Sequence, residues 1–156
     1  MAIAWTSDLD TGIDEIDKQH RQIVDFINRL EAAICHQDRD SVGAVLHALV
    51  EYCGSHFAFE EHLQERVGYK LAQPHKAAHD LFVKRLARYQ EKHNAGEDVA
   101  RQLHDMLSTW LVHHIKRDDM GYVADVKRAT DGMDGEQQKG DWLSRSVAGF
   151  FGSNPH

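Results

Sequence analysis

The sequence has few of the features that mark secreted, membrane-spanning or nucleic-acid-binding proteins. It contains only two cysteines in 156 residues, too few for a disulfide-stapled scaffold. No apolar run approaches the roughly 18 residues that a membrane-spanning helix needs. Residues 1–5 carry no basic segment ahead of an apolar one, so we expect no leader peptide and a cytoplasmic protein.

Basic side chains are also too few and too scattered to bind nucleic acid. The chain has 18 Lys and Arg residues against 25 Asp and Glu, a formal net charge of −7. No Lys/Arg cluster could follow a phosphate backbone. A length of 156 residues suits one domain with a sizeable core. The abundant residue is histidine, with 12 copies, and imidazole is both a common metal ligand and costly to bury without a partner.

Four segments carry a stripe of mostly apolar residues at spacings of three and four, the pattern of bundle helices. The four stripes are Ile16, His20, Ile23, Ile27, Leu30 and Ile34; Val42, Leu46, Leu49, Cys53, His56, Glu60, Leu63 and Val67; His75, His79, Phe82, Leu86, Tyr89 and His93; and Val99, Leu103, Leu107, Trp110 and His114. Short turns separate them, which predicts an all-α bundle of antiparallel helices.

Local signals place the ends of these helices. Asp38, Asp40 or Ser41 is suited to cap the second helix, Gly68 to end it, and Pro74 to lie in the first turn of the third. Residues 1–12 lack helical periodicity and form an arm, whose Trp5 we expect to pack on the bundle. Antiparallel pairing offsets the two cysteines by about ten residues, or roughly 15 Å, so we expect two reduced thiols.

Polar residues interrupt the apolar stripes at one height. His56 and Glu60 form one i, i+4 pair and His75 and His79 another, on opposite sides of a short turn. A Glu in a core stripe is rarely tolerated unless it is paired or binds a metal. Antiparallel pairing brings His20 and His114 to the same level. The other histidines lie off the stripes or off this layer, and we assign them no direct role: His36, His47, His62, His93, His104, His113 and His156.

The layer therefore holds five imidazoles, Glu60, and one further carboxylate from Asp118 or Asp119. Seven donors exceed one tetrahedral site and suit two six-coordinate ions that share bridging carboxylates. Iron fits this mixture of ligands, and manganese or zinc is compatible with it. A ferritin-like site would need a Glu-x-x-His pair on each of two helices, and the chain contains no such pair.

From about Trp5 to Val126 the sequence resembles the bacterial single-domain hemerythrins. The matching positions are Gly12 with Ile13, Ile16 with Asp17, Gln19 with His20, His56 with Phe57, Glu60 with Glu61, Gly68 with Tyr69, His75, His79, Trp110 with Leu111, and His114 with Ile115. The resemblance implies an up-down-up-down four-helix bundle around a non-haem di-iron centre with an oxo or hydroxo bridge, whose ligand is dioxygen.

Carried over by position, the resemblance assigns the ligands. His75, His79 and His114 would hold one iron, and His20 and His56 the other, which keeps an open position. Glu60 and an Asp would bridge the pair. The family's apolar pocket matches Phe57, Trp110, Leu111 and Ile115.

The bridging Asp divides two lines of argument. Regular helix geometry favours Asp118, at i+4 from His114, whereas Asp119 at i+5 would be turned away by about 140°. The family's His-x-x-x-x-Asp spacing selects Asp119. We follow the family, which requires a local irregularity in the helix.

The sequence thus predicts reversible dioxygen binding, in a carrier, store or sensor. The alternative is a di-iron enzyme that acts on peroxide, nitric oxide or an oxidisable substrate; the apolar pocket, without an acid or nucleophile, favours binding over catalysis. We expect the bundle to occupy residues 1–130. Residues 131–156 would form a linker and a short amphipathic helix that folds back on the bundle or contacts a protein partner or a membrane surface.

Overall fold

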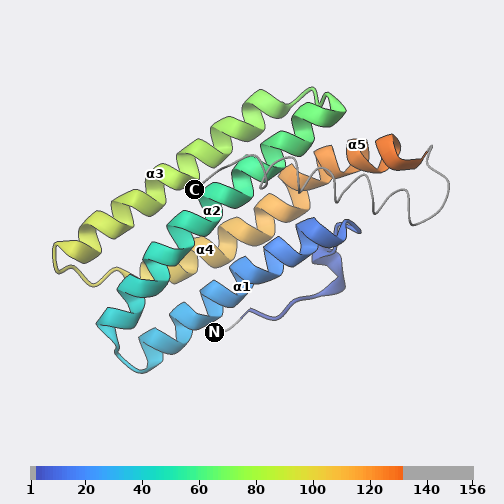
Figure 1. Cartoon of the computed structure of the whole chain (residues 1–156). Helices are drawn as coiled ribbons and strands as arrows, with labels where there is room; N and C mark the ends of the chain where they lie inside the picture. Colours follow the sequence, from blue (N-terminus) through green and yellow to red (C-terminus); the bar gives the residue numbers. More distant parts are fainter. Residues whose placement is uncertain (1–2, 132–156) are drawn as a thin grey trace, which may run out of the picture.

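The computed structural model describes residues 3–131, which are helical along most of their length. The elements are a short 3-10 helix η1 (Ser7–Leu9), α1 (Asp14–Cys35), α2 (Arg39–Val67), α3 (Ala72–Asn94), α4 (Ala100–His113), a π-helix η2 (His114–Asp119) and α5 (Met120–Asp131). No strand occurs within the described residues. Because α4, η2 and α5 follow one another without a break, they form the fourth rod of the bundle (Figure 1).

The rods lie side by side and alternate in direction (Figure 1). α1 packs against α2 and α4, while α2 also packs against α3 and α5. The predicted all-α, up-down-up-down four-helix bundle is therefore confirmed. The N-terminal arm is tied to α1, because the Asn28 side chain accepts from the Ile3 backbone N–H at 2.7 Å and donates to the Ile3 carbonyl at 2.9 Å. Trp5 packs against the core, as expected.

The helix ends follow the local signals in the sequence. The Asp38 carboxylate accepts a hydrogen bond of 3.1 Å from the Ser41 backbone N–H and caps α2. Gly68 ends α2 in the left-handed conformation, with φ 65°. Pro74 lies in the first turn of α3, where its missing N–H costs little. Both cysteines are free, Cys35 exposed and Cys53 buried, and burial raises the pKa of the Cys53 thiol.

The core has two apolar parts with a polar layer between them. The larger part runs toward the α1–α2 turn and includes Ile23, Leu49 and Leu103. The smaller part lies at the other end and consists of Ile13, Ile16, Phe59, Leu63, Tyr122, Val123 and Val126. In α1, His20 lies between Ile16 of the smaller part and Ile23 of the larger. The polar residues therefore interrupt a core that is otherwise apolar.

The C-terminal tail and the membrane-spanning character of the helices were also subjects of prediction. The amphipathic helix expected in the C-terminal tail falls in residues 132–156, outside the described residues. Within the described residues, no helix has the length and apolar character needed to cross a membrane.

Two glycine substitutions should have opposite effects on stability. A Cβ at Gly121 would clash with the hydroxyl of Tyr69, whereas a Cβ at Gly54 would meet no atom within 4 Å. We expect Gly121→Ala to lower the free energy of unfolding by about 1–3 kcal/mol, because the ring must move. Gly54→Ala should raise it by roughly 0.5–1 kcal/mol through helix propensity.

Urea denaturation of both variants tests this expectation. Adding Tyr69→Phe to Gly121→Ala removes the clashing oxygen and should recover part of the loss. Equal stability of the two single variants would contradict the packing of Tyr69 on Gly121.

Candidate metal centre

The structure brings all seven predicted ligand residues together in two overlapping groups. One group holds Glu60, His75, His79, His114 and Asp119, and the other holds His20, His56 and Glu60. Within each group the potential ligand atoms lie within 4.8 Å of one another. All seven side chains are buried. The four rods thus deliver their polar residues to a single layer, as the helix pairing predicts.

The fourth rod meets this layer through a π-helix. In an α-helix, Asp119 would point about 140° away from His114. Residues 114–119 form a π-helix instead, whose wider turn closes between residues i and i+5. Asp119 therefore returns to the face of His114, and its Oδ1 lies 3.1 Å from His114 Nε2.

Asp118 lies outside the cluster. Its side chain is 39% exposed, and its Oδ2 lies 3.1 Å from the outer nitrogen, Nδ1, of His114. The regular-helix argument that favoured Asp118 fails because it assumes an α-helix where the chain forms a π-helix.

Glu60 lies between the two groups of histidines. Its Oε1 contacts His56 and lies 3.6 Å from His20 Nε2. Its Oε2 lies on the other side, 3.7 Å from His75 Nε2, 3.5 Å from His79 Nε2 and 3.8 Å from His114 Nε2. Each oxygen of this carboxylate therefore serves a different group.

Asp119 repeats the arrangement. Its Oδ2 lies 3.0 Å from His20 Nε2, and its Oδ1 lies 3.0 Å from His75 Nε2 and 3.1 Å from His114 Nε2. Two carboxylates that each direct one oxygen to either group have the geometry of bridging ligands between two cations.

Several of these buried atoms make no well-aligned hydrogen bond, although some of them lie at ion-pair distance from one another. They include both ring nitrogens of His20, Nε2 of His56, both carboxylate oxygens of Glu60 and Oδ2 of Asp119. A buried polar group without a partner costs roughly 1–3 kcal/mol, and a charged one costs more. Metal ions in the layer would bind all of these atoms except His20 Nδ1, which faces away from its centre, because each is a nitrogen or oxygen donor of the type that iron binds. The residues present therefore fit a pair of cations.

The layer also shifts the pKa values of its members. Burial alone would raise the pKa of Glu60, but the imidazoles of His56, His114 and His20 hold it well below its usual range. Burial and the Glu60 carboxylate would likewise raise the pKa of Asp119, yet His114 and His20 lower it to about 2. Both carboxylates are therefore ionised at neutral pH.

The histidines respond in different directions. Burial would lower the pKa of His20, but Asp119 and Glu60 raise it to about 9. The same two carboxylates, with Asp118, overcome burial and raise the pKa of His114 well above its usual value. For His56, burial prevails and the pKa is lowered. Metal uptake at this layer must therefore displace protons from His20 and His114.

Outer residues hold the far side of three imidazoles. The Gln19 amide oxygen lies 2.7 Å from His56 Nδ1, and the Gln64 amide nitrogen lies 2.8 Å from His75 Nδ1. The Asp118 carboxylate takes the same position behind His114. Sequence reasoning assigned no such role to them, although Gln64 follows Glu60 by one helical turn. Outer partners of this kind fix the orientation of a metal-binding imidazole. When His75 binds a metal through Nε2, its Nδ1 carries the proton, and the Gln64 amide must turn its oxygen toward it to accept.

Aromatic rings stack on two of the imidazoles. The Phe57 ring lies 3.9 Å from that of His79 at an interplanar angle of 9°, and Trp110 lies 4.4 Å from His114 at 14°. Phe82, which the sequence placed only in the core stripe, stacks on Trp110 at 3.8 Å. Leu111 and Ile115 are buried in the larger apolar part. The four predicted pocket residues thus belong to the apolar side of the layer.

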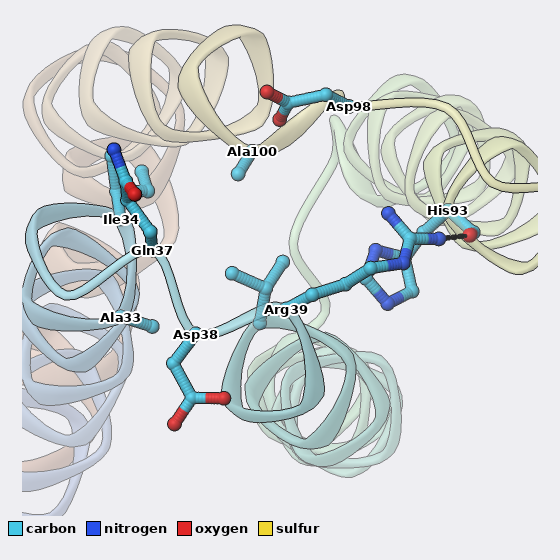
Figure 2. Close-up of a pocket in the computed structure, with 9 residues that line it drawn as sticks. Ala33, Ile34, Gln37, Asp38, Arg39, His93, Asp98 and Ala100 are labelled. Atoms are coloured by element: carbon cyan, nitrogen blue, oxygen red, sulfur yellow. Dashed lines mark hydrogen bonds between the residues drawn. The ribbon is translucent and has the colours of Figure 1, made fainter.

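Two further buried histidines lie away from the layer. His104 Nε2 lies 3.4 Å from Glu31 Oε2. His93 lines a hollow of about 340 Å³ between the α1–α2 turn and the α3–α4 connection (Figure 2). Arg39 crosses this hollow and donates to the backbone carbonyls of His93 and Glu97. Its guanidinium therefore holds the α3–α4 connection and is not aimed at a ligand.

Comparison with known proteins points to one family. The sequence model of the "Hemerythrin HHE cation binding domain" matches residues 11–126. A bacteriohemerythrin of Stenotrophomonas maltophilia (strain R551-3) is 44% identical over 150 residues, which cover 96% of this chain and 98% of that protein. One of Methylococcus capsulatus (strain ATCC 33009 / NCIMB 11132 / Bath) is 34% identical over 122 residues, 77% of this chain and 93% of that protein. The alignment with a solved wild-type hemerythrin covers 80% of this chain and 97% of the hemerythrin chain. Its TM-score is 0.75, and the two sequences are 32% identical.

The metal-free protein should lose stability as the pH rises from 6.5 to about 9. A base whose pKa is raised by folding stabilises the native state fully below its unfolded value, and the contribution is lost as the proton leaves. For a fully buried His20 this amounts to about 3 kcal/mol.

Urea unfolding of the metal-free protein on either side of this pH window checks the sign. The His20→Asn variant is the control and should show a weaker pH dependence, with only His114 contributing. A metal-free wild type that becomes more stable at the higher pH would contradict the ion pairs of His20.

Proposed function

Because the chain belongs to the hemerythrin family, we propose that it binds dioxygen reversibly at a non-haem di-iron centre, as a carrier, store or sensor. The observation that carries this proposal is the placement of the two buried carboxylates. Glu60 and Asp119 each direct one oxygen to the three-histidine group and the other oxygen to His20 or its neighbour His56. A single cation would not require both carboxylates to direct their two oxygens to different histidine groups.

The proposed ligand set follows from that geometry. His75, His79 and His114 would hold one iron, His20 and His56 the other, and Glu60 and Asp119 both. The second position has one imidazole fewer, which leaves it open to an external ligand. When bound, two ferrous ions supply that open position and the two electrons on which reversible dioxygen binding draws.

The apolar side of the layer supports binding over catalysis. Phe57, Trp110, Leu111 and Ile115 contribute no acid, base or nucleophile to it, and all four belong to or pack on the larger apolar part. Such residues exclude water, which would otherwise bring protons to the bound gas. Turnover of peroxide or an oxidisable substrate would call for a proton donor at the open position.

We also propose that the bundle ends near residue 130 and that residues 131–156 form an amphipathic tail for a protein partner. The Methylococcus relative is similar to 77% of this chain, whereas the Stenotrophomonas relative is similar to 96% of it. The family model ends at residue 126, which supports a tail that is separable from gas binding. We propose a cytoplasmic location for the whole protein.

Reduction followed by exposure to dioxygen tests the main proposal. We expect the iron-loaded protein, reduced under argon, to form a visible absorption band on exposure to dioxygen and to lose it when the gas is removed. The zinc-loaded protein, which has no redox chemistry, is the control and should remain colourless. Rapid oxidation without a reversible band would favour the enzyme alternative instead.

Substitution of the ligands should lower the iron content. Glu60→Ala removes a ligand shared by both irons, so iron per chain should fall further than in His79→Ala, which affects one position. The matched control is His104→Asn, which changes a buried histidine outside the layer. Iron content measured by atomic emission after reconstitution decides the matter. Full iron occupancy in the Glu60 variant would contradict the proposed ligand set.

A further inference from the structure

The residues behind the histidines differ between the two proposed iron positions. We infer that these outer residues make the position of His75, His79 and His114 the first of the two irons to be oxidised. The inference rests on the proposed di-iron function and deepens it. It concerns the nitrogen Nδ1 of each imidazole, which faces away from the centre of the layer.

Carboxylates stand behind the three-histidine position. Asp118 Oδ2 lies 3.1 Å from His114 Nδ1, within hydrogen-bond distance. Glu61 Oε1 lies 3.7 Å from His79 Nδ1, close enough for an electrostatic contact. A carboxylate that accepts from Nδ1–H makes the imidazole a stronger electron donor and stabilises the higher charge of a ferric ion.

Solvent reduces this effect without removing it. The side chains of Asp118 and Glu61 are 39% and 29% exposed, so water and salt screen part of their charge. The two imidazoles that they face are 1% exposed and pass the interaction directly into the layer.

The open position has only neutral or absent partners. Gln19 accepts from His56 Nδ1 at 2.7 Å through its amide oxygen, which carries a dipole and no net charge. Nδ1 of His20 has no hydrogen-bond partner and is fully buried. An iron held by these two imidazoles receives less electron density from the protein, so the ferrous state is favoured there.

A relay holds the neutral partner in place. The Gln19 amide nitrogen donates to Glu15 Oε1 at 3.0 Å, which orients the amide oxygen toward His56. His56 is then protonated at Nδ1 and keeps the lone pair of Nε2 for the metal. The Glu15 carboxylate reaches His56 only through the Gln19 amide. Glu15 also lines a surface cleft of about 330 Å³. Glu15 and Gln19 are therefore positioning residues for His56.

The expected oxidation proceeds in two balanced steps. With both irons bound, one electron would leave the iron held by His75, His79 and His114, which would become ferric, and would reduce one ferricyanide to ferrocyanide. A second electron leaves the open iron and reduces a second ferricyanide. Between the steps the pair has an odd electron count, so it gives an electron paramagnetic resonance signal.

A matched pair of substitutions tests this order. Gln64 and Gln19 lie behind His75 and His56, one at each iron position; the Gln64 amide nitrogen is 2.8 Å from Nδ1 and the Gln19 amide oxygen is 2.7 Å from Nδ1, and a Glu at either position would present an oxygen there. Changing either to Glu adds the same charge at nearly the same distance. The Gln64→Glu variant should lower the reduction potential of the first couple and so increase the difference in potential between the two couples. The Gln19→Glu variant should lower the potential of the second couple and so decrease that difference.

The measurement is an anaerobic redox titration of the iron-loaded protein with ferricyanide, followed by the resonance signal. We expect each variant to change the equilibrium constant of its own couple by about tenfold, or about 59 mV for one electron. The maximum signal should therefore rise in Gln64→Glu and fall in Gln19→Glu. Asp118→Asn, at a partly exposed position, keeps the shape and removes the charge, and it should lower the maximum.

The outcomes separate the inference from its premise. Equal changes in both glutamate variants, or a maximum that falls in Gln64→Glu and rises in Gln19→Glu, would overturn the order of oxidation. An unchanged maximum of the resonance signal in Asp118→Asn would show that the Asp118 charge does not set the order of oxidation, and the inference would lose its principal cause. A wild type that shows no odd-electron state on titration would also overturn the order of oxidation, whereas a wild type that binds only one iron per chain would overturn the di-iron premise itself.

Discussion

The whole structure depends on two carboxylates buried in the middle of an apolar core. Glu60 and Asp119 have no exposure to solvent, and both are ionised at neutral pH. A buried charge is tolerated only if opposite charges or metal ions surround it. The five imidazoles meet that requirement, and each of the four rods contributes at least one of them. The short turns of the bundle serve to hold these imidazoles at one height.

The fold and the ligand layer could be predicted because they follow from regular geometry. Apolar residues at spacings of three and four define the stripes, and short turns fix which residues share a level. His20 and His114 were placed in the layer by this reasoning alone. The choice of Asp119 could not be reached in the same way, since a regular helix selects Asp118. Asp119 follows His114 by five residues, a spacing that a π-helix brings to one face. From the sequence, only the family resemblance identifies the residue at this spacing as the ligand.

The outer residues were harder to anticipate, for a different physical reason. Whether Gln64 contacts His75 depends on the rotation of α2 against α3 and on side-chain rotamers, which periodicity does not specify. The stacking of Trp110 on His114 has the same origin. These contacts fall mainly on the three-histidine side of the layer, where Phe57 also stacks on His79. That side is therefore held by both rings and carboxylates, while His20 has neither behind it.

The π-helix also constrains how this chain can change over time. Beyond Asp119 the apolar residues Tyr122, Val123 and Val126 pack in the smaller part of the core only because the wider turn has shifted their angular position. If residues 114–119 wound as an α-helix with no residue removed, everything after them would rotate by about 100°. That change would withdraw the shared carboxylate and turn the face of α5 away from its neighbours. A deletion of one residue in this segment would cancel the rotation, because the aspartate would then follow His114 at i+4 on the same face, so ligand set and C-terminal packing are inherited as a unit.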